Sequence, residues 1–367
     1  MPDIELLHVS VEYPRRVMAL HDICLSVSKG EFISLIGPSG SGKSSLLRII
    51  AGLVSPKEGD VRFDGQSVLE KKPQERNTAM IFQNLALYPH MTIYQNIAYP
   101  LLSRGYSKQT VREKVEDTAR MLGLIQLLEK RPRRLSGGQR QLTAIARALV
   151  RDPDIFLLDE PFSSLDEASR SMLRSQILRL HERMPGTTFV YAAHDQVEAF
   201  ALSDRVALLR EGRLVMYDTP GTLYTRPADL FAASFIGGGR MNLLPGILPG
   251  GKVLFGIFPE NLSLASGLSP EDLSQGTTGK IIITAISDGL VRKGTSVTGA
   301  FSVPAGSCLT GCLTGMKNSG KYLFSDSGSI QYYTSISEGW PEKGTPVILT
   351  ASEENVNIFD SLSGKRV

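Results

Sequence analysis

The chain has 367 residues, of which 42% are hydrophobic and 21% charged, and its formal net charge is only +3. This length and balance indicate a soluble globular protein of about two domains, which can bury a core without disulfide or metal support. The small charge excludes the basic surface of a typical nucleic-acid-binding protein. The three cysteines, Cys24, Cys308 and Cys312, are too few for a disulfide framework and indicate reduced thiols. No apolar stretch approaches ~18 residues and no signal-peptide core is seen, so any link to a membrane is expected to run through partners.

A glycine-rich loop lies between a predicted strand and a predicted helix near the N-terminus. Residues 4–33 read as short strands, the apolar run 32–36 predicts a buried strand, and residues 44–53 have helical spacing. The loop sequence GPSGSGKS fits the pattern G-x-x-x-x-G-K-[ST]. Glycines let backbone N–H groups turn towards phosphate oxygens, and the helix adds its positive end. Lys43 is expected to bridge the β- and γ-phosphates of ATP, and Ser44 to ligate Mg²⁺. The predicted ATP contacts here are Gly37, Pro38, Ser39, Gly40, Ser41, Gly42, Lys43, Ser44 and Ser45.

A second candidate anion site precedes an amphipathic helix predicted at 139–151, after a further helical region at 105–130. Ser136 is a natural N-cap, and the next two glycines leave backbone N–H groups open at the positive end of that helix. One polypeptide rarely brings two such sites to the same phosphate. Two copies arranged head-to-tail would instead pair each glycine-rich loop with the second site of the other copy. The residues predicted to contact ATP across such a dimer are Ser136, Gly137, Gly138 and Gln139.

Two carboxylates follow the next buried strand, which is predicted at 155–158. Asp159 and Glu160 would lie at the strand end, where ligands bind in open α/β sheets. Asp159 is expected to help hold Mg²⁺, and Glu160 to act as the general base that activates the attacking water.

The remaining elements define two predicted domains. Helices at 169–183 and 195–202 alternate with strands at 187–192 and 206–209, which predicts a parallel sheet covered on both faces. After Ile236 the sequence becomes rich in Gly, Ser and Thr with short β-rich runs, and the glycines at 237–239 predict a hinge. We therefore expect an α/β nucleotide-binding domain over 1–237 and a small all-β domain over 238–367.

In this order the motifs resemble the ABC ATPase family over about 230 residues. The resemblance implies a P-loop NTPase domain with a helical subdomain. It identifies Gln83 with the family's Q-loop glutamine, which contacts Mg²⁺ or the attacking water and senses the transmembrane partner. Asp166, in the segment SSLD, corresponds to the D-loop at the dimer interface, and His194 to the switch histidine that contacts the γ-phosphate. Tyr13 corresponds to the aromatic residue that stacks on adenine.

Several stretches resemble, more narrowly, the ATPases of maltose-type and sn-glycerol-3-phosphate-type importers. They include residues 87–93, 194–199, 224–227 and 358–360, whereas Phe258 stands where that group usually has Arg. This resemblance implies an OB-like β-barrel as second domain and a place at the cytoplasmic face of the cell membrane. The implied partners are a second ATPase subunit (the same chain or a paralogue), two transmembrane permease subunits and, indirectly, a solute-binding protein. The implied solute is a sugar, glycerol or related polyol.

Other assignments stay open at this stage. The ATPases of polyamine and ferric-ion importers also carry a β-rich tail. Soluble ABC ATPases of DNA maintenance fit less well, because they carry a long coiled coil between the two ATP motifs, and no heptads occur between Lys43 and Asp159. ABC-type translation factors usually hold two ATPase units per chain. A nucleotide-dependent binding module without turnover is disfavoured by Glu160, and an ATPase assay would decide.

Overall fold

The protein consists of two compact units. A computed structural model describes residues 2–14, 16–82, 85–163, 165–248, 251–265, 280–293, 296–304, 308–311, 320–323, 328–334 and 341–367. The first unit spans Met1–Pro220 and the second Gly221–Val367. None of the helices in these ranges is both long and apolar enough to cross a lipid bilayer.

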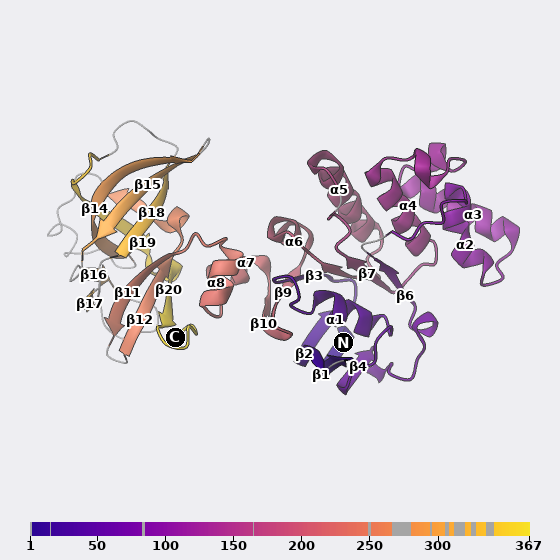
Figure 1. The fold of residues 1–367 in the computed structure, drawn as a ribbon, viewed down its shortest axis with the longest axis horizontal. Coiled ribbons are helices and arrows are strands. Elements are labelled where there is room, and N and C mark those ends of the chain that lie inside the picture. Colours follow the sequence, from indigo (N-terminus) through magenta and orange to yellow (C-terminus); the bar gives the residue numbers. More distant parts are fainter. Residues whose placement is uncertain are drawn as a thin grey trace. The chain divides into compact units, whose positions relative to one another are not determined.

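A six-stranded sheet forms the centre of the first unit, in the order β10-β9-β3-β8-β7-β6 (Figure 1). All neighbouring pairs except β10–β9 are parallel. Of the four inner strands, β3, β8 and β7 are buried along their whole length, which confirms the buried strands predicted at 32–36 and 155–158. The strands are β3 (Phe32–Ile36), β6 (Thr78–Ile81), β7 (Ile155–Asp159), β8 (Thr188–Ala192), β9 (Arg205–Arg210) and β10 (Arg213–Asp218).

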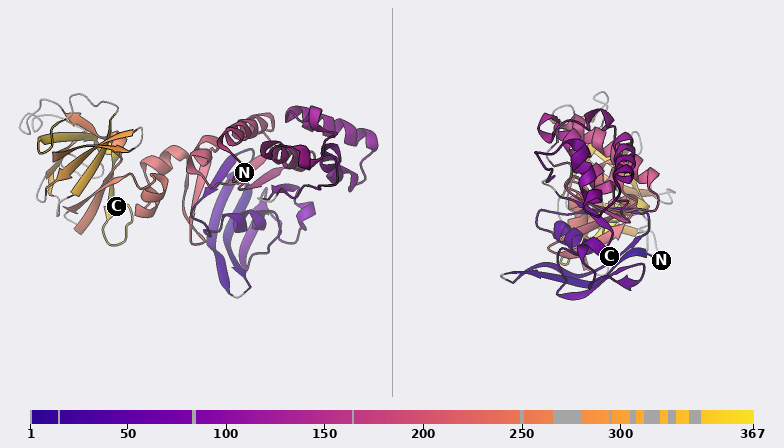
Figure 2. Two further views of the ribbon diagram at one scale, coloured as in Figure 1. Left: turned by 45° about the horizontal axis from the view of Figure 1, so that its top comes forward. Right: turned by 90° about the vertical axis from the view of Figure 1, so that its right-hand side faces the viewer.

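An antiparallel sheet of the order β2-β1-β4-β5 makes a second layer of this unit. Its long strands β1 (Pro2–Tyr13) and β2 (Val17–Ser28) lie side by side, indigo in Figures 1 and 2. β4 (Glu58–Phe63) and β5 (Gln66–Ser67) complete it. One apolar core joins this sheet to helix α1 (Lys43–Ile50) and to one face of the central sheet, through residues such as Leu6, Leu47 and Leu157.

Helices cover the other face and form a separate group. In α5 (Glu167–Arg183), His181 packs edge-on against Phe32 of the central sheet, with ring centroids 5.4 Å apart. The short α6 (Gln196–Leu202) follows β8. Between β6 and β7 lie α2 (Ile93–Leu102), α3 (Lys108–Met121) and α4 (Gly137–Leu149), which is the helical subdomain. The helical region predicted at 105–130 is shorter, because Gly123 follows α3 with a φ of 68° and the chain then turns through 3₁₀ segments.

The second unit is mainly β-structure, as predicted. A three-stranded sheet has the order β11-β12-β20, and a larger antiparallel sheet contains β13-β19-β14-β15-β18 with β16 and β17 attached. The inward residues of both sheets, including Phe255, Ile283 and Phe301, share one apolar core. The strands are β11 (Asn242–Leu248), β12 (Gly251–Ile257), β13 (Ser263–Ala265), β14 (Lys280–Lys293), β15 (Ser296–Val303), β16 (Cys308–Gly311), β17 (Gly320–Leu323), β18 (Gly328–Thr334), β19 (Pro346–Ser352) and β20 (Val356–Asp360). Cys312 lies outside the described residues.

Two short helices, α7 (Pro220–Thr225) and α8 (Leu230–Ile236), precede these strands. The contacts of the chain divide it at Pro220, whereas the domain boundary predicted from the sequence follows Gly237. Tyr224 of α7 stacks on Phe258, with centroids 4.3 Å apart, and Ala233 of α8 joins an apolar cluster with Phe258 and Phe359. These helices therefore pack as part of the second unit.

Candidate functional site

The glycine-rich loop runs from the end of β3 into α1, as its sequence predicted. Gly37 and Gly42 have φ values of 148° and 106°, which side-chain-bearing residues rarely adopt. A Cβ atom at Gly37 would lie 2.2 Å from the carbonyl oxygen of Leu209, and one at Gly42 would lie 2.8 Å from that of Ala19. The loop can therefore keep this curve only with glycine at both positions.

Lys43 is held over this loop by backbone oxygens. Its Nζ donates hydrogen bonds to the carbonyls of Gly37 at 2.9 Å and Pro38 at 3.2 Å, and the residue is 7% exposed. Burial lowers the pKa of the Lys43 ammonium, while the carboxylates of Glu160 and Asp159 act in the opposite direction. A cation held at the positive end of a helix, beside inward-turning N–H groups, suits a polyanionic phosphate chain.

Ser44 and Asp159 meet although they are far apart in the sequence. The Ser44 hydroxyl, on the first turn of α1, donates a hydrogen bond of 2.8 Å to Asp159 Oδ1 at the end of β7. Asp159 is 6% exposed. A hydroxyl and a carboxylate oxygen in contact are hard ligands of the kind that Mg²⁺ takes in nucleotide sites, so this pair fits the predicted metal.

Glu160 and His194 line one cavity of about 200 Å³. Glu160 has a φ of 47°, and its backbone N–H donates to Ala192 O on the neighbouring strand at 3.1 Å. A non-glycine residue at positive φ costs about 1–3 kcal/mol and persists only where neighbours fix it, as at many active sites. His194 lies between β8 and α6, whose N-cap Asp195 accepts from Glu198 N–H. The geometry thus brings the predicted base and the predicted switch histidine together.

Tyr13 is anchored beside the phosphate loop. Its hydroxyl donates to Ser45 Oγ at 3.3 Å, so the end of β1 is tied to the first turn of α1. The ring is partly buried. Stacking of this ring on adenine stays a prediction.

Ser136 caps α4, as predicted, in a reciprocal capping box with Gln139. Ser136 Oγ accepts from Gln139 N–H at 3.3 Å, and Gln139 Oε1 accepts from Ser136 N–H at 3.1 Å. A Cβ atom at Gly137 would lie 3.2 Å from Leu165, which is a tight contact, whereas one at Gly138 would lie at an ordinary 3.6 Å from Met172. Contact of this segment with a nucleotide on another copy stays a prediction.

Asp166 is the N-cap of α5. Its carboxylate accepts from the backbone N–H and the hydroxyl of Ser169, at 2.9 and 2.8 Å, and these bonds lower the pKa of Asp166. Ser164, in the same predicted D-loop, lies outside the described residues, and so does Gln83. The segment after Gln83 is described: Arg147 of α4 donates to the carbonyls of Leu85 and Ala86 and lies 5.7 Å from the Tyr88 ring centroid.

Three residues beside the cavity of Glu160 and His194 are not among those predicted from the sequence. Tyr191 on β8, Glu198 on α6 and Arg170 on α5 line the same cavity. Arg170 Nε lies 3.4 Å from Glu198 Oε1, and Arg170 also donates to the carbonyl of Leu165. They come from three elements, and no local sequence pattern marks Glu198 as buried or brings the three together.

Comparisons with known proteins identify the family of the chain. A family model described as "ABC transporter" matches residues 20–163. The sn-glycerol-3-phosphate import ATP-binding protein UgpC of Chromohalobacter salexigens is 46% identical over 286 residues, which cover 76% of this chain and 77% of the relative. The trehalose import ATP-binding protein SugC of Mycobacterium tuberculosis is 48% identical over 245 residues, 67% of this chain and 62% of the relative.

The fold is also similar to that of a solved ATP-binding cassette. It is the ATP-binding cassette MJ0796 in a dimeric, post-hydrolysis state bound to ADP and Pi. The two chains are 31% identical with a TM-score of 0.53, over 59% of this chain and 98% of that one. The chain therefore belongs to the ABC transporter family and is one of its ATP-binding, ATP-hydrolysing proteins.

Proposed function

We propose that this chain is the ATP-hydrolysing subunit of an importer for a small solute of the sugar, glycerol or glycerol phosphate class. Relatives at 43–48% identity that are named for the import of sn-glycerol-3-phosphate and trehalose support the solute class. The observation that carries hydrolysis is the cavity shared by Glu160 and His194, next to the contact between Ser44 and Asp159.

The phosphate loop and the Ser44–Asp159 pair would hold the nucleotide. Lys43 would exchange the carbonyls of Gly37 and Pro38 for oxygens of the β- and γ-phosphates, which are charge-assisted and stronger partners. Ser44, Asp159 and Gln83 would hold Mg²⁺. When bound, this ion neutralises charge on the phosphate oxygens. Tyr13, fixed to Ser45, would present its ring to adenine.

Glu160 would take a proton from the attacking water as general base. Its unusual backbone conformation and its bond to Ala192 fix the direction of its side chain from the end of β7. His194, which lines the same cavity, would contact the γ-phosphate and orient the water. Both groups would act on one water molecule because they line the same space.

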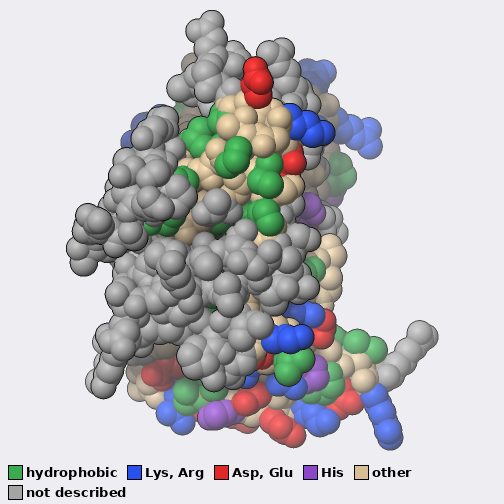
Figure 3. Space-filling model, turned by 90° about the vertical axis from the view of Figure 1, so that its left-hand side faces the viewer, with side chains coloured by type: hydrophobic (Ala, Val, Ile, Leu, Met, Phe, Trp, Pro, Cys, Tyr) green, Lys and Arg blue, Asp and Glu red, His purple; other side chains and the backbone are tan. Residues whose placement is uncertain are grey.

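The second copy would complete each site. Ser136, Gly137, Gly138 and Gln139 of one copy would contact the phosphates held by the other, with Asp166 at the interface. Closing of this dimer would be coupled to two permease subunits through the surface around Gln83 and residues 85–91, which Arg147 braces. The chain would thus work at the cytoplasmic face of the membrane without crossing it. Described Lys and Arg side chains are seen together with Asp and Glu in Figure 3, and the net charge of only +3 supports a partner other than nucleic acid.

The test is purification of this chain from detergent-solubilised membranes of its own host, with identification of the proteins that accompany it. Two multi-span membrane proteins and a solute-binding protein are expected, and calorimetry with that binding protein is expected to select a sugar or a glycerol derivative. A polyamine or ferric-ion ligand would overturn the solute class. A chain that stays alone, or that carries nucleic acid, would overturn the importer assignment.

A further inference from the structure

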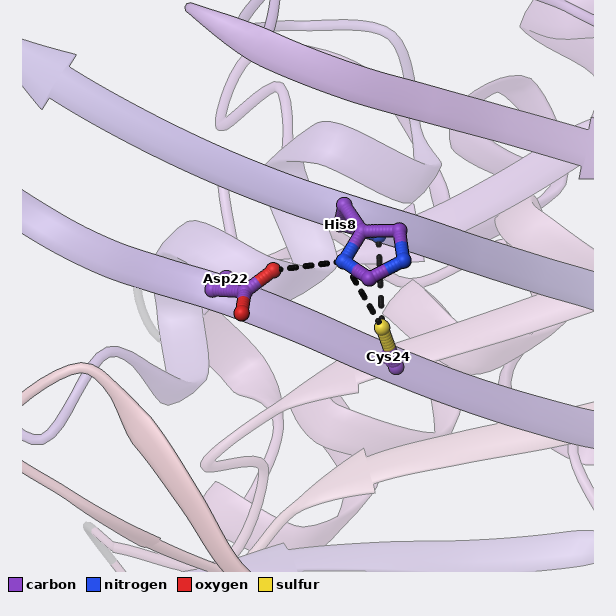
Figure 4. Close-up of side chains that lie close together, drawn as sticks. All are labelled: His8, Asp22 and Cys24. Atoms are coloured by element: carbon purple, nitrogen blue, oxygen red, sulfur yellow. Dashed lines mark hydrogen bonds and ion pairs between the residues drawn. The ribbon is translucent and has the colours of Figure 1, made fainter.

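Three potential metal ligands meet on the outer face of the antiparallel sheet, apart from the ATP site. Figure 4 shows His8 of β1 beside Asp22 and Cys24 of β2. His8 Nδ1 lies 2.7 Å from Asp22 Oδ1 and 3.6 Å from Cys24 Sγ, and the three donor atoms all lie within 4.8 Å of one another. The side chains of His8 and Asp22 are 77% and 67% exposed, and Cys24 is exposed as well. Solvent and ions therefore reach all three.

Two irregularities in the strand pairing create this arrangement. Between the pairs Leu6–Leu25 and Val9–Ile23, β1 has one residue more than β2. Between Val9–Ile23 and the next pair, Val11–Leu20, the extra residue is in β2. Such β-bulges re-aim side chains. The residues His8 and Asp22 lie within these intervals and have φ values of 53° and 51°. The two bulges thus bring an imidazole and a carboxylate together on the face where Cys24 already points outwards.

We propose that His8, Asp22 and Cys24 form a binding site for a borderline-soft divalent cation of the Zn²⁺ class. Imidazole, carboxylate and thiolate are the three ligand types that Zn²⁺ takes, whereas one carboxylate alone is a poor site for Mg²⁺ or Ca²⁺. Tetrahedral Zn²⁺ with ordinary bond lengths separates its nitrogen and sulfur ligands by about 3.6 Å, which is the spacing found here. The fourth position would face solvent and take a water molecule.

Binding changes the protonation of the ligands. The Cys24 thiol loses its proton to solvent, and the neutral imidazole of His8 carries its remaining proton on Nε2, so that Nδ1 is free to bind the metal. The hydrogen bond between His8 and Asp22 is replaced by two bonds to the metal, and the 2.7 Å contact opens to about 3.3 Å. The ion would join β1 to β2 midway along the strand that ends at Tyr13. The site does not depend on the ATP chemistry proposed above.

The probe for this site is Co²⁺, added to the full, reduced and nucleotide-free chain after chelation. Thiolate–Co²⁺ bonds give a charge-transfer band that oxygen sites do not. One equivalent of Co²⁺ is expected to give this band, and Zn²⁺ to remove it. Cys24→Ser is expected to abolish the band, and His8→Ala and Asp22→Asn to weaken Co²⁺ binding at least about tenfold. The matched controls Cys308→Ser and His90→Ala are expected to bind Co²⁺ like the wild type.

A second measurement uses Zn²⁺ itself. Zn²⁺ is expected to raise the melting temperature of the wild type and leave that of Cys24→Ser unchanged, because an ion that binds only the folded chain stabilises it. The proposal is overturned if the band is missing, if it persists in Cys24→Ser, or if His8→Ala and Asp22→Asn bind Co²⁺ as the wild type does. Any of these results would leave His8 and Asp22 as a hydrogen-bonded surface pair.

Discussion

The hydroxyl of Tyr191 donates a hydrogen bond of 2.9 Å to Oε2 of Glu198, and the two residues are only 1% and 4% exposed. Arg170 approaches the other oxygen of the same carboxylate from α5. The strand that leads to His194, the helix that follows it and the helix that follows Asp166 therefore meet at one buried carboxylate. A charge in such a place affects stability in a way that depends on pH.

Glu198→Gln is expected to change how stability varies with pH. Burial raises the pKa of Glu198 above its ordinary value of 4.5, so the folded chain holds this proton more tightly than the unfolded chain does. The resulting stabilisation is fully present below pH 4.5 and is lost as the pH rises through the folded pKa, by about 1.4 kcal/mol for each unit of pKa difference. Urea denaturation of both proteins over this range should show the wild type losing stability relative to Glu198→Gln. Parallel profiles would contradict the assignment.

Glu160→Gln is expected to bind ATP and hardly hydrolyse it. Loss of a general base typically costs about 10²–10⁴-fold in rate, and the amide keeps the size of the side chain. Steady-state phosphate release and equilibrium binding of a fluorescent ATP analogue separate the two effects. Glu211→Gln is a matched control, because Glu211 is an exposed glutamate that also has a positive φ, of 49°. A Glu160→Gln rate close to that of wild type would refute the assigned role.

Ser44→Ala is expected to raise the Mg²⁺ concentration needed for half-maximal hydrolysis. The substitution removes a proposed metal ligand and leaves Asp159, which is buried, without its 2.8 Å donor. ATPase rates over a series of Mg²⁺ concentrations would measure the shift. Ser175→Ala serves as the control, because the Ser175 hydroxyl donates to the carbonyl of Ser171 in its own helix. Equal Mg²⁺ dependence in Ser44→Ala and wild type would remove Ser44 from the site.

Mixing two impaired variants tests whether ATP lies between two copies. Ser136→Ala is expected to lower the rate of hydrolysis roughly 10–100-fold, which corresponds to the loss of one hydrogen bond to a charged group. Lys43→Ala is expected to abolish hydrolysis. In a head-to-tail dimer, a mixed pair of these single variants contains one site with both residues intact. The mixture should therefore regain activity well above either variant alone. If the mixture forms mixed dimers but regains no ATPase activity, Ser136 does not contribute to the ATP site of the other copy.

The features that the sequence predicted best are those formed by short continuous segments. The phosphate loop, the buried strands β3 and β7 and the N-cap Ser136 each depend on neighbours within a few residues, and the structure confirms them. The contact of Ser44 with Asp159 was expected only through the general rule that ligands bind at strand ends.

Features made by distant segments could not be predicted in this way. The buried group of Tyr191, Glu198 and Arg170 requires three elements to pack, and nothing in the local pattern marks Glu198 as buried. His8 and Asp22 meet because two β-bulges shift the pairing register of β1 and β2. The alternation of apolar residues in the sequence does not show where such bulges occur. The end of α3 depended on the conformation of a single residue, Gly123.

The packing of α8 determines where this chain can be cut. Ala233 and Ile236 of this helix are buried, and Ala233 shares a cluster with Met241 and Phe258. A fragment that stops after Gly237 would keep α8 but lose Met241 and Phe258, which pack against it. The apolar side of α8 would then face water and promote aggregation. A fragment that stops at Pro220 would leave no such stripe. Exchange of second units between related ATPases should for the same reason take α7 and α8 along with the strands.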